Sequence, residues 1–268
     1  MSVTRVIAGA GLLLVMAVGK PLSQTAPPND LGVSVGHMPL VVRDLEASKK
    51  LWMTMGAMPA KLGANEVMKF PGMLVLLRQG EPTGGSVGSV VNDIGFKVAN
   101  IQRSLSAWRA AGIETAPGSR PTQAFVNTPE GLRIEILEDT ALTVPIAGDH
   151  VRFSAPEASV AEMRNWYVKM FGGKPAKRGA NDVVEMPGGV ALSFTRSPDG
   201  AKGAPTAGRT LDHIGFEVKD LEAFCKKLEA AGIKFDRPYQ RSATGLLVAN
   251  ITDPWGTYIE LSEGLNKL

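Results

Sequence analysis

Residues 212–218 read Asp-His-Ile-Gly-Phe-Glu-Val, and residues 93–98 repeat most of this stretch as Asp-Ile-Gly-Phe-Lys-Val. The similarity extends outward from this pair in both directions. Further matched pairs along the chain are 63–72 with 179–188, 110–113 with 230–233, and 131–136 with 256–261. Similarity between two parts of one chain is the signature of a duplicated structural unit. The repeat therefore predicts tandem domains, at residues 35–140 and 147–266.

Each predicted domain divides again into two similar units. Asp44 and Ser159 are suited to cap a helix after the first strand of each domain, and Ser159 with Glu162 reads as a capping box. Asn100 and Asp220 are suited to cap the second helices in the same way. Short strand-like runs broken by Gly, Pro or Asn follow every helix. The predicted unit is a strand, a helix and about three further strands, and it occurs four times.

The alternation of apolar and polar residues along the strands indicates which side chains face a site. In residues 213–218 the even-numbered positions are apolar and are expected to pack under a helix. The same alternation applies to residues 150–154 and 257–262. The functional side chains that it places on the opposite, polar face are His150, Arg152, His213, Glu217, Tyr258 and Glu260.

Length and composition fit a globular chain with well-formed cores. The chain has 268 residues, of which 44% are hydrophobic and 21% are charged. The net charge is only +3, and no run of Lys or Arg is present. Nucleic acid is therefore not expected as a partner.

The N-terminus has the pattern of an export signal. One positive charge precedes an apolar run at residues 6–19, and a polar, proline-rich stretch follows. This run is shorter than the roughly 20 residues that a membrane span needs. We expect a cleaved signal at 1–26, a linker at 27–34, and an exported protein, periplasmic or secreted, without stable membrane insertion. An uncleaved anchor and a start codon placed too early remain the alternatives.

Three segments carry a resemblance to a known superfamily. They are Asp149-His150, Asp212-His-Ile-Gly-Phe216 and Asp253-Pro-Trp-Gly-Thr-Tyr-Ile-Glu260. Over roughly residues 35–265 the chain resembles the vicinal oxygen chelate superfamily, which includes glyoxalase I, bleomycin-resistance proteins and type I extradiol dioxygenases. The resemblance implies an α+β fold of four βαβββ modules. These would pair into two open, barrel-like mixed β-sheet domains with helices on the outside.

The resemblance also implies a metal site in the second domain. His150, His213 and Glu260 would hold one divalent ion, with Fe(II) as first choice and Mn, Zn, Co or Ni as alternatives. A small-molecule substrate would chelate that ion through adjacent oxygens, and the ion would act as a Lewis acid. The four-module layout is most like that of the extradiol dioxygenases.

Two departures from the family pattern bear on the reaction. Glyoxalase I has a fourth, carboxylate ligand, and Ser193 stands near the matching position here. The dioxygenases use further histidines, and this chain has none between His150 and His213 or after His213. The pocket candidates are Arg152, Ser193, Glu217 and Tyr258. Arg152 either binds a substrate carboxylate or phosphate or pairs with Glu217, and Tyr258 either lines the pocket or packs.

The first domain resembles a degenerate copy of the second. Its counterparts of the ligands are His37, Asp93 and Glu135. Lys97 and Arg133 share a strand face with these acids, so neutralisation by salt bridges is favoured over metal binding.

The resemblance favours an exported metal-dependent enzyme, which would be a dioxygenase, lyase or isomerase. The alternatives are a bleomycin-resistance-like protein that binds a small molecule without catalysis, and a scaffold that uses a metal only for stability. The intact ligand set favours the enzyme, and the missing acid/base histidines favour the scaffold. The sequence does not assign the substrate, and it does not decide whether the chain forms a homodimer.

Overall fold

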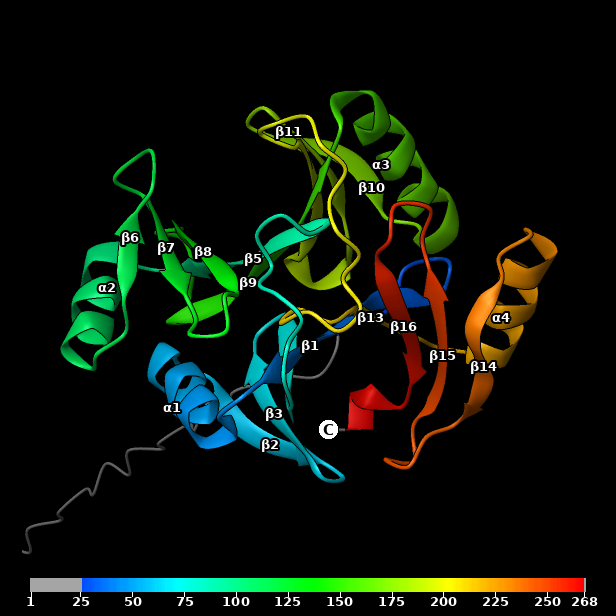
Figure 1. The fold of residues 1–268 in the computed structure, drawn as a ribbon, viewed down its shortest axis with the longest axis horizontal. Helices are drawn as coiled ribbons and strands as arrows, with labels where there is room; N and C mark the ends of the chain where they lie inside the picture. Colours follow the sequence, from blue (N-terminus) through cyan, green and yellow to red (C-terminus); the bar gives the residue numbers. More distant parts are fainter. Residues whose placement is uncertain (1–25, 268) are drawn as a thin grey trace, which may run out of the picture.

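The computed structural model describes residues 26–267, which form four βαβββ modules (Figure 1). Module 1 consists of β1 (Val33–Val42), α1 (Leu45–Met55), β2 (Met58–Leu62), β3 (Asn65–Phe70) and β4 (Met73–Gln79). Module 2 consists of β5 (Val91–Val98), α2 (Ile101–Ala110), β6 (Thr115–Pro117), β7 (Gln123–Asn127) and β8 (Arg133–Glu138). The predicted α+β class and the predicted module are confirmed.

The second half of the chain repeats the same order of elements. Module 3 consists of β9 (Ile146–Ala155), α3 (Glu157–Phe171), β10 (Lys174–Arg178), β11 (Asn181–Glu185), the 3-10 turn η1 (Pro187–Gly189) and β12 (Ala191–Arg196). Module 4 consists of β13 (Ile214–Val218), α4 (Leu221–Ala230), β14 (Phe235–Arg241), β15 (Leu247–Thr252), β16 (Tyr258–Glu263) and the 3-10 turn η2 (Leu265–Lys267).

Helix capping follows the sequence in three modules. The side chains of Asp44, Asn100 and Asp220 each accept a hydrogen bond from a backbone N–H in the first turn of α1, α2 and α4. The prediction for α3 was wrong. This helix begins at Glu157, after Pro156, and Ser159 lies inside its first turn instead of capping it. Proline already has the φ that a helix start requires, which explains the earlier start.

The strands form two open, eight-stranded mixed sheets, and modules distant in the sequence share a sheet. One sheet has the order β14-β15-β16-β13-β1-β4-β3-β2 and joins modules 1 and 4; we call it the 1/4 sheet. The other has the order β10-β11-β12-β9-β5-β8-β7-β6 and joins modules 2 and 3; we call it the 2/3 sheet. In each sheet the first strands of the two modules pair antiparallel at the centre.

This pairing corrects the predicted domain division. The tandem domains at 35–140 and 147–266 each contain modules that lie in different sheets. The connections between modules explain the difference. Only residues 139–145 separate β8 from β9, so module 3 continues beside module 2 in the same sheet. The longer connections 80–90 and 197–213 lead the chain from one sheet to the other.

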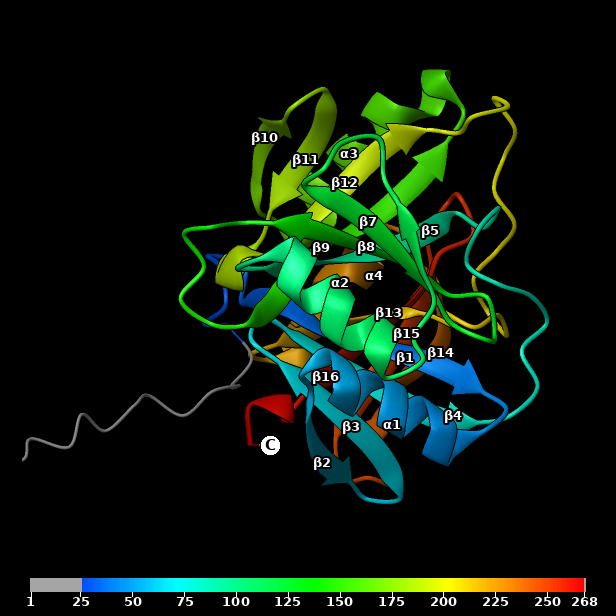
Figure 2. The same ribbon diagram turned by 90° about the vertical axis from the view of Figure 1, so that its left-hand side faces the viewer.

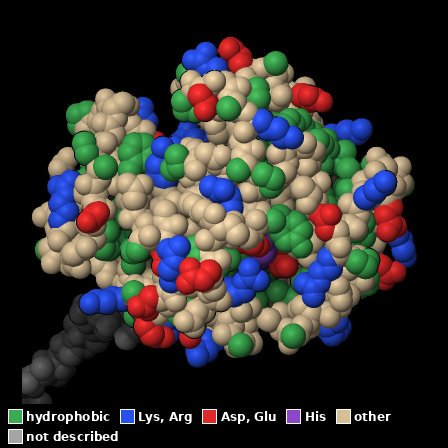
Figure 3. Space-filling model, viewed as in Figure 1, with side chains coloured by type: hydrophobic (Ala, Val, Ile, Leu, Met, Phe, Trp, Pro, Cys, Tyr) green, Lys and Arg blue, Asp and Glu red, His purple; other side chains and the backbone are tan. Residues whose placement is uncertain are grey.

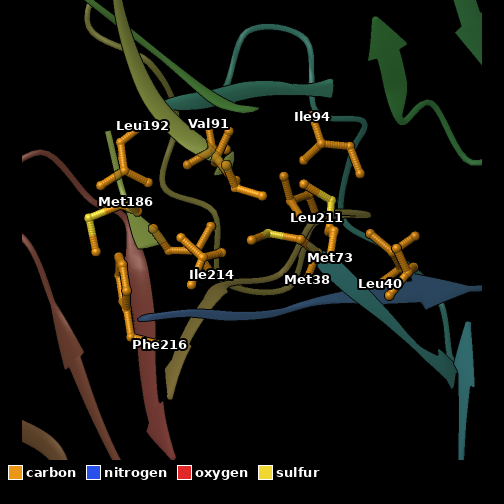
Figure 4. Packing of buried hydrophobic residues seen from close by; sticks show 14 of the residues in the cluster. Met38, Leu40, Met73, Val91, Ile94, Met186, Leu192, Leu211, Ile214 and Phe216 are labelled. Atoms are coloured by element: carbon orange, nitrogen blue, oxygen red, sulfur yellow. The ribbon is translucent and has the colours of Figure 1, made fainter. Parts of the chain in front are cut away.

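Both sheets contribute to one hydrophobic core. Trp52 of α1 lies 5.9 Å from Phe96 of β5, and Phe171 of α3 stacks at 4.2 Å on Phe216 of β13, measured between ring centroids. Figure 4 shows residues of both sheets in this core, with Val91 and Ile94 above Ile214 and Met38. Figure 2 views the molecule from the side on which α1 and α2 lie. The two sheets are therefore held together by apolar packing.

No helix among residues 26–267 is long and apolar enough to span a membrane. The predicted export signal at 1–26 lies, except for its last residue, outside the described residues.

The shared core predicts that both sheets unfold together. The change Trp52→Ala should lower the free energy of unfolding by about 3–5 kcal/mol, because it removes a fully buried indole between the sheets. Met53→Ala, at a half-exposed neighbouring position, should cost far less. Denaturant unfolding followed by far-UV circular dichroism and by tryptophan fluorescence should give one coincident transition for the wild type. Two separate transitions would show that the sheets are independent.

Candidate metal centre and its second copy

Three side chains of the 1/4 sheet meet on the face opposite the shared core. His37 comes from β1, His213 directly precedes β13, and Glu260 comes from β16. Nε2 of His37 lies 3.2 Å from Oε1 of Glu260, and Nε2 of His213 lies 3.9 Å from Oε2 of Glu260. One ligand atom from each residue lies within 4.8 Å of the other two. This spacing allows all three side chains to bind one ion.

A glycine in the repeated Ile-Gly-Phe motif makes room for the histidine on the neighbouring strand. His37 pairs with Gly215, and a Cβ atom at Gly215 would overlap the His37 imidazole ring. In the 2/3 sheet, Gly95 pairs with His150 and leaves the same space for its ring. The motif that reveals the repeat in the sequence thus forms the floor of both sites.

The hydrogen bonds in the 1/4 sheet leave metal-binding atoms free. Oδ1 of Asp212 lies 2.5 Å from Nδ1 of His213, a contact that places the proton on Nδ1 and the lone pair on Nε2. Nε2 of His213 is buried and has no hydrogen-bond partner among the described residues. Burial on its own would raise the pKa of Glu260, but the two histidines outweigh it and lower the pKa to about 2. Two imidazoles and an ionised carboxylate are a donor set suited to a divalent transition metal.

The surroundings of this cluster are apolar on one side. Among residues 26–267, no Arg or Lys forms a salt bridge with Glu260. The buried apolar cluster of the 1/4 sheet consists of Leu62, Val67, Leu74, Leu76, Leu246, Val248 and Leu265. Leu74 pairs with His37 in the β1–β4 ladder, so these side chains share a face. In Figure 3 a histidine surface is visible beside acidic atoms in a hollow, near the place of β13 and β16 in Figure 1.

A second cluster lies at the equivalent place in the 2/3 sheet. It consists of Asp93 of β5, Glu135 of β8 and His150 of β9, all of which are buried. Here a guanidinium group contacts every member. Nε of Arg152 donates to Oδ1 of Asp93 at 2.9 Å, and Nη2 of Arg152 forms an ion pair with Glu135. Nη2 also lies 2.9 Å from Nε2 of His150.

Further charges surround this second cluster. Nη2 of Arg133 lies 2.8 Å from Oδ2 of Asp93, and Nδ1 of His150 lies 2.7 Å from Oδ2 of Asp149. Burial on its own would lower the pKa of His150, but the contacts with Asp149 and Asp93 outweigh it and raise the pKa to about 9. Asp149 and Arg152 therefore occupy both ring nitrogens of His150, so neither nitrogen is free for a metal.

The structure corrects the predicted grouping of ligands. His213 and Glu260 do lie together, but His150 belongs to the other sheet and His37 takes its place. The predicted first-domain set is divided in the same way, because Asp93 and Glu135 lie with His150. The cause is the antiparallel pairing of β1 with β13 and of β5 with β9, which brings together modules that the tandem division had separated.

The predicted salt bridges in the degenerate copy are present in part. Arg133 pairs with Asp93 as expected, whereas Lys97 pairs with Asp139 and Asp149.

The other pocket candidates also divide between the sheets. Arg152 does not pair with Glu217, which accepts hydrogen bonds from the Ser262 hydroxyl and the Gly264 N–H in the 1/4 sheet. Ser193 pairs with Arg152 in the β9–β12 ladder and lines a cavity on the face of the 2/3 sheet that holds the second cluster. Tyr258 lies beside the candidate metal centre, with its ring edge-to-face on His213 at 5.6 Å.

Sequence reasoning did not select His37 as a ligand of the candidate centre. The positions of Arg and Lys in the sequence do indicate which modules share a sheet. Arg133 and Lys97 accompany the acids of module 2, and Arg152 accompanies His150 of module 3, whereas no Arg or Lys stands within two residues of His37 or His213. Because buried acids are usually paired with cations, the acids of module 2 and the arginine of module 3 indicate that these two modules share one sheet.

Comparison with known proteins identifies the fold and one segment with family similarity. Residues 149–261 match the family model described as Glyoxalase/Bleomycin resistance protein/Dioxygenase superfamily. Glyoxalase I from Zea mays is similar in structure, with a TM-score of 0.66, 14% identity, and coverage of 88% of this chain and 94% of the maize chain. A Bacillus subtilis protein provisionally assigned as a dioxygenase has a TM-score of 0.61 and 13% identity, covering 90% of this chain and 86% of that one. A search of curated proteins finds no match.

The fold is therefore that of a vicinal oxygen chelate protein with four modules. Within this fold, residues 149–261 are the part of the chain that is similar in sequence to the glyoxalase, bleomycin-resistance and dioxygenase superfamily. At these low identities the solved structures establish the fold and leave the reaction open.

The two glycines give a matched pair of variants. The change Gly215→Ala should abolish metal binding and lower stability by about 1–3 kcal/mol, because the new methyl group displaces the His37 ring. The change Gly95→Ala should cost similar stability through the His150 ring but leave metal content unchanged. Elemental analysis and thermal unfolding measure the two effects. Equal metal loss in both variants would contradict the assignment of the centre to the 1/4 sheet.

The raised pKa of His150 predicts a dependence of stability on pH. A group whose pKa is raised on folding stabilises the protein fully below its ordinary value, here 6.5, and the stabilisation is lost as pH rises through about 9. The melting temperature of the metal-free protein should therefore fall by several degrees between these values. In His150→Gln this part of the fall should disappear. An unchanged pH profile in that variant would show that His150 is not the titrating group.

Proposed function

We propose that this chain is a metal-dependent enzyme of the vicinal oxygen chelate type, with its centre at His37, His213 and Glu260. The observation that carries the proposal is the buried Nε2 of His213, which has no hydrogen-bond partner among the described residues. The hydrogen bond that Nδ1 of His213 donates to Asp212 holds Nε2 toward Glu260. A buried polar atom without a partner is costly. Coordination of a metal by this atom would remove that cost.

The proposed ligand set leaves coordination positions open for substrate. Two imidazoles and one carboxylate suit non-haem Fe(II), which remains our first choice, with Mn, Zn, Co or Ni as alternatives. A bound ion would act as a Lewis acid on a small molecule that presents adjacent oxygens. The role of His37, His213 and Glu260 is to bind the ion, and the role of Asp212 is to orient His213.

The residues around the centre narrow the reaction class. Leu76 pairs with Pro39 two positions beyond His37, where the 2/3 sheet has Ser193 paired with Arg152. This is the place of the fourth carboxylate that the resemblance to glyoxalase I would require. Leucine can neither bind a metal nor accept a proton. A reaction of the glyoxalase I kind, which depends on that base, is therefore disfavoured.

The apolar cluster indicates the kind of substrate. Leu74 and Leu76 of β4 and Val248 of β15 extend over the same face as the ligands. Burial of an apolar molecule against these side chains would leave its two oxygens directed at the ion. Tyr258, beside His213, is the nearest phenol that could donate a proton to such a substrate.

A second candidate function is a protein that binds a metal for stability without catalysis. The observation that favours it is Leu76, because the centre lacks a carboxylate at that place. We further propose that the chain is exported, on the basis of the apolar run at residues 6–19.

Metal content tests the proposed centre. The purified chain should bind about one divalent ion, because one ligand set has free donors and the other is paired with cations. The variants His37→Ala and His213→Ala should lose the ion, whereas His150→Ala should retain it. Elemental analysis after removal of loose metal measures this. Loss of the ion in His150→Ala, with retention in His37→Ala, would reverse the assignment.

Turnover tests whether the metal protein is an enzyme. We expect activity on a catechol in a panel that also contains 2-oxoacids and adducts of 2-oxoaldehydes with thiols. Activity should be lost in Glu260→Ala, and Tyr258→Phe should reduce it about 10²-fold or more without changing metal content. Absence of turnover with a fully loaded centre would favour the stabilising metal, and turnover that survives Glu260→Ala would place the chemistry elsewhere.

A further inference from the structure

The 2/3 sheet carries a cavity of about 620 Å³ on the face that holds Asp93, Glu135 and His150. The cavity is rich in cationic side chains. The arginines that line it are Arg120, Arg133, Arg152, Arg178 and Arg196. Only three carboxylates line it, those of Asp93, Glu135 and Asp149. Arg178 and Arg196 also pair with carboxylates outside the lining, Glu185 and Glu157, so the arginines that bear on a ligand are Arg120, Arg133 and Arg152.

The guanidinium group of Arg152 lies at the position that a metal ion would occupy among the three cluster residues. Its guanidinium group contacts Oδ1 of Asp93, the carboxylate of Glu135 and Nε2 of His150, which are the three atoms that could serve as ligands. A metal cannot approach these atoms while the guanidinium occupies the space between them. In the 1/4 sheet the equivalent position is Pro39, which brings no cation to the cluster, and Nδ1 of His37 and Nε2 of His213 have no hydrogen-bond partner among the described residues.

Arg152 still has hydrogen-bonding capacity toward the cavity. Nε and Nη2 are used by the cluster, whereas Nη1 has no partner among the described residues. Arg133 likewise uses Nε and Nη2 on Asp93 and keeps Nη1 open, and its guanidinium lies 5.3 Å from the centre of the Phe125 ring. Planar guanidinium groups with free N–H donors are well suited to carboxylates and phosphates.

The remaining lining adds a small donor and an outer cation. Ser193 is buried and lies next to Arg152 in the β9–β12 ladder, with its hydroxyl on the cavity face. Arg120 is exposed at the cavity and has no acidic partner within salt-bridge distance in the part of the chain described. An anion would therefore meet one unpaired arginine outside and two partly open guanidinium groups inside.

We infer that the 2/3 cavity is a metal-free binding site for a small oxyanion, a carboxylate or a phosphate, and that the guanidinium group of Arg152 recognises it from the place of the missing metal. The two sheets would then bind different ligands, a metal ion in the 1/4 sheet and an anion in the 2/3 sheet. The 1/4 sheet presents metal donors and apolar side chains, and the 2/3 sheet presents a fixed cation and further arginines. This inference does not depend on catalysis at the 1/4 centre.

Calorimetry on the full-length protein tests the inference, with malonate and inorganic phosphate as probes. The background is His213→Ala, which removes the other site at which an anion could coordinate a metal. One of the two probes should bind at one site per chain, and the preferred probe tells a carboxylate site from a phosphate site. Arg152→Ala should weaken binding about tenfold or more, and Arg120→Gln several-fold. Arg103→Gln, on the exposed face of α2, is the matched control and should change nothing.

Metal stoichiometry gives an independent readout. Arg152→Ala uncovers Asp93, Glu135 and His150, so this variant should take up an additional divalent ion. The wild type should not. Failure of both probes to bind at millimolar concentration, or a second ion in the wild type, would overturn the inference. Because Arg120→Gln leaves the buried cluster intact, its effect is informative even if Arg152→Ala is unstable.

Discussion

The antiparallel pairing of the central strands decides which side chains meet in each cluster. β1 runs beside β13, and His37 packs its ring over Gly215. β5 runs beside β9, and His150 packs over Gly95. Each pairing therefore places the histidine of one module's first strand beside the ligand residues of another module. A glycine without a side chain is what allows the histidine to lie across its partner strand, so the repeated motif and the site are one feature.

The two sheets have equivalent strand orders and different side chains around their clusters. In the 1/4 sheet, Asp212 orients His213, and a lone pair is left buried without a partner. In the 2/3 sheet, Asp149 has the same relation to His150, but Arg152 reaches the ligand atoms and pairs with them. The difference comes from few positions, above all Pro39 against Arg152 and Leu76 against Ser193. A change of side chain at the ligand cluster can therefore place an internal cation among the ligand positions without altering the fold.

Much of the fold could be predicted from the sequence. The repeats marked the modules, the capping residues Asp44, Asn100 and Asp220 marked helix starts, and strand alternation separated core from site. The pairing of modules could not be predicted in that way, because each module satisfies its local pattern whichever partner it has. His150 and His37 occupy equivalent positions, so the pattern around them does not say which of them meets His213. That choice depends on long-range packing, such as Phe171 on Phe216, and on the short connection at 139–145.

The most direct test of the central assignment is an anomalous difference map from a crystal of the chain loaded with Mn²⁺ or Zn²⁺. We expect one peak, about 2.0–2.3 Å from an imidazole nitrogen of His37, from Nε2 of His213 and from the carboxylate of Glu260. The guanidinium group of Arg152 should remain among Asp93, Glu135 and His150, with no peak there. A peak bound by His150, or none near Glu260, would contradict the assignment.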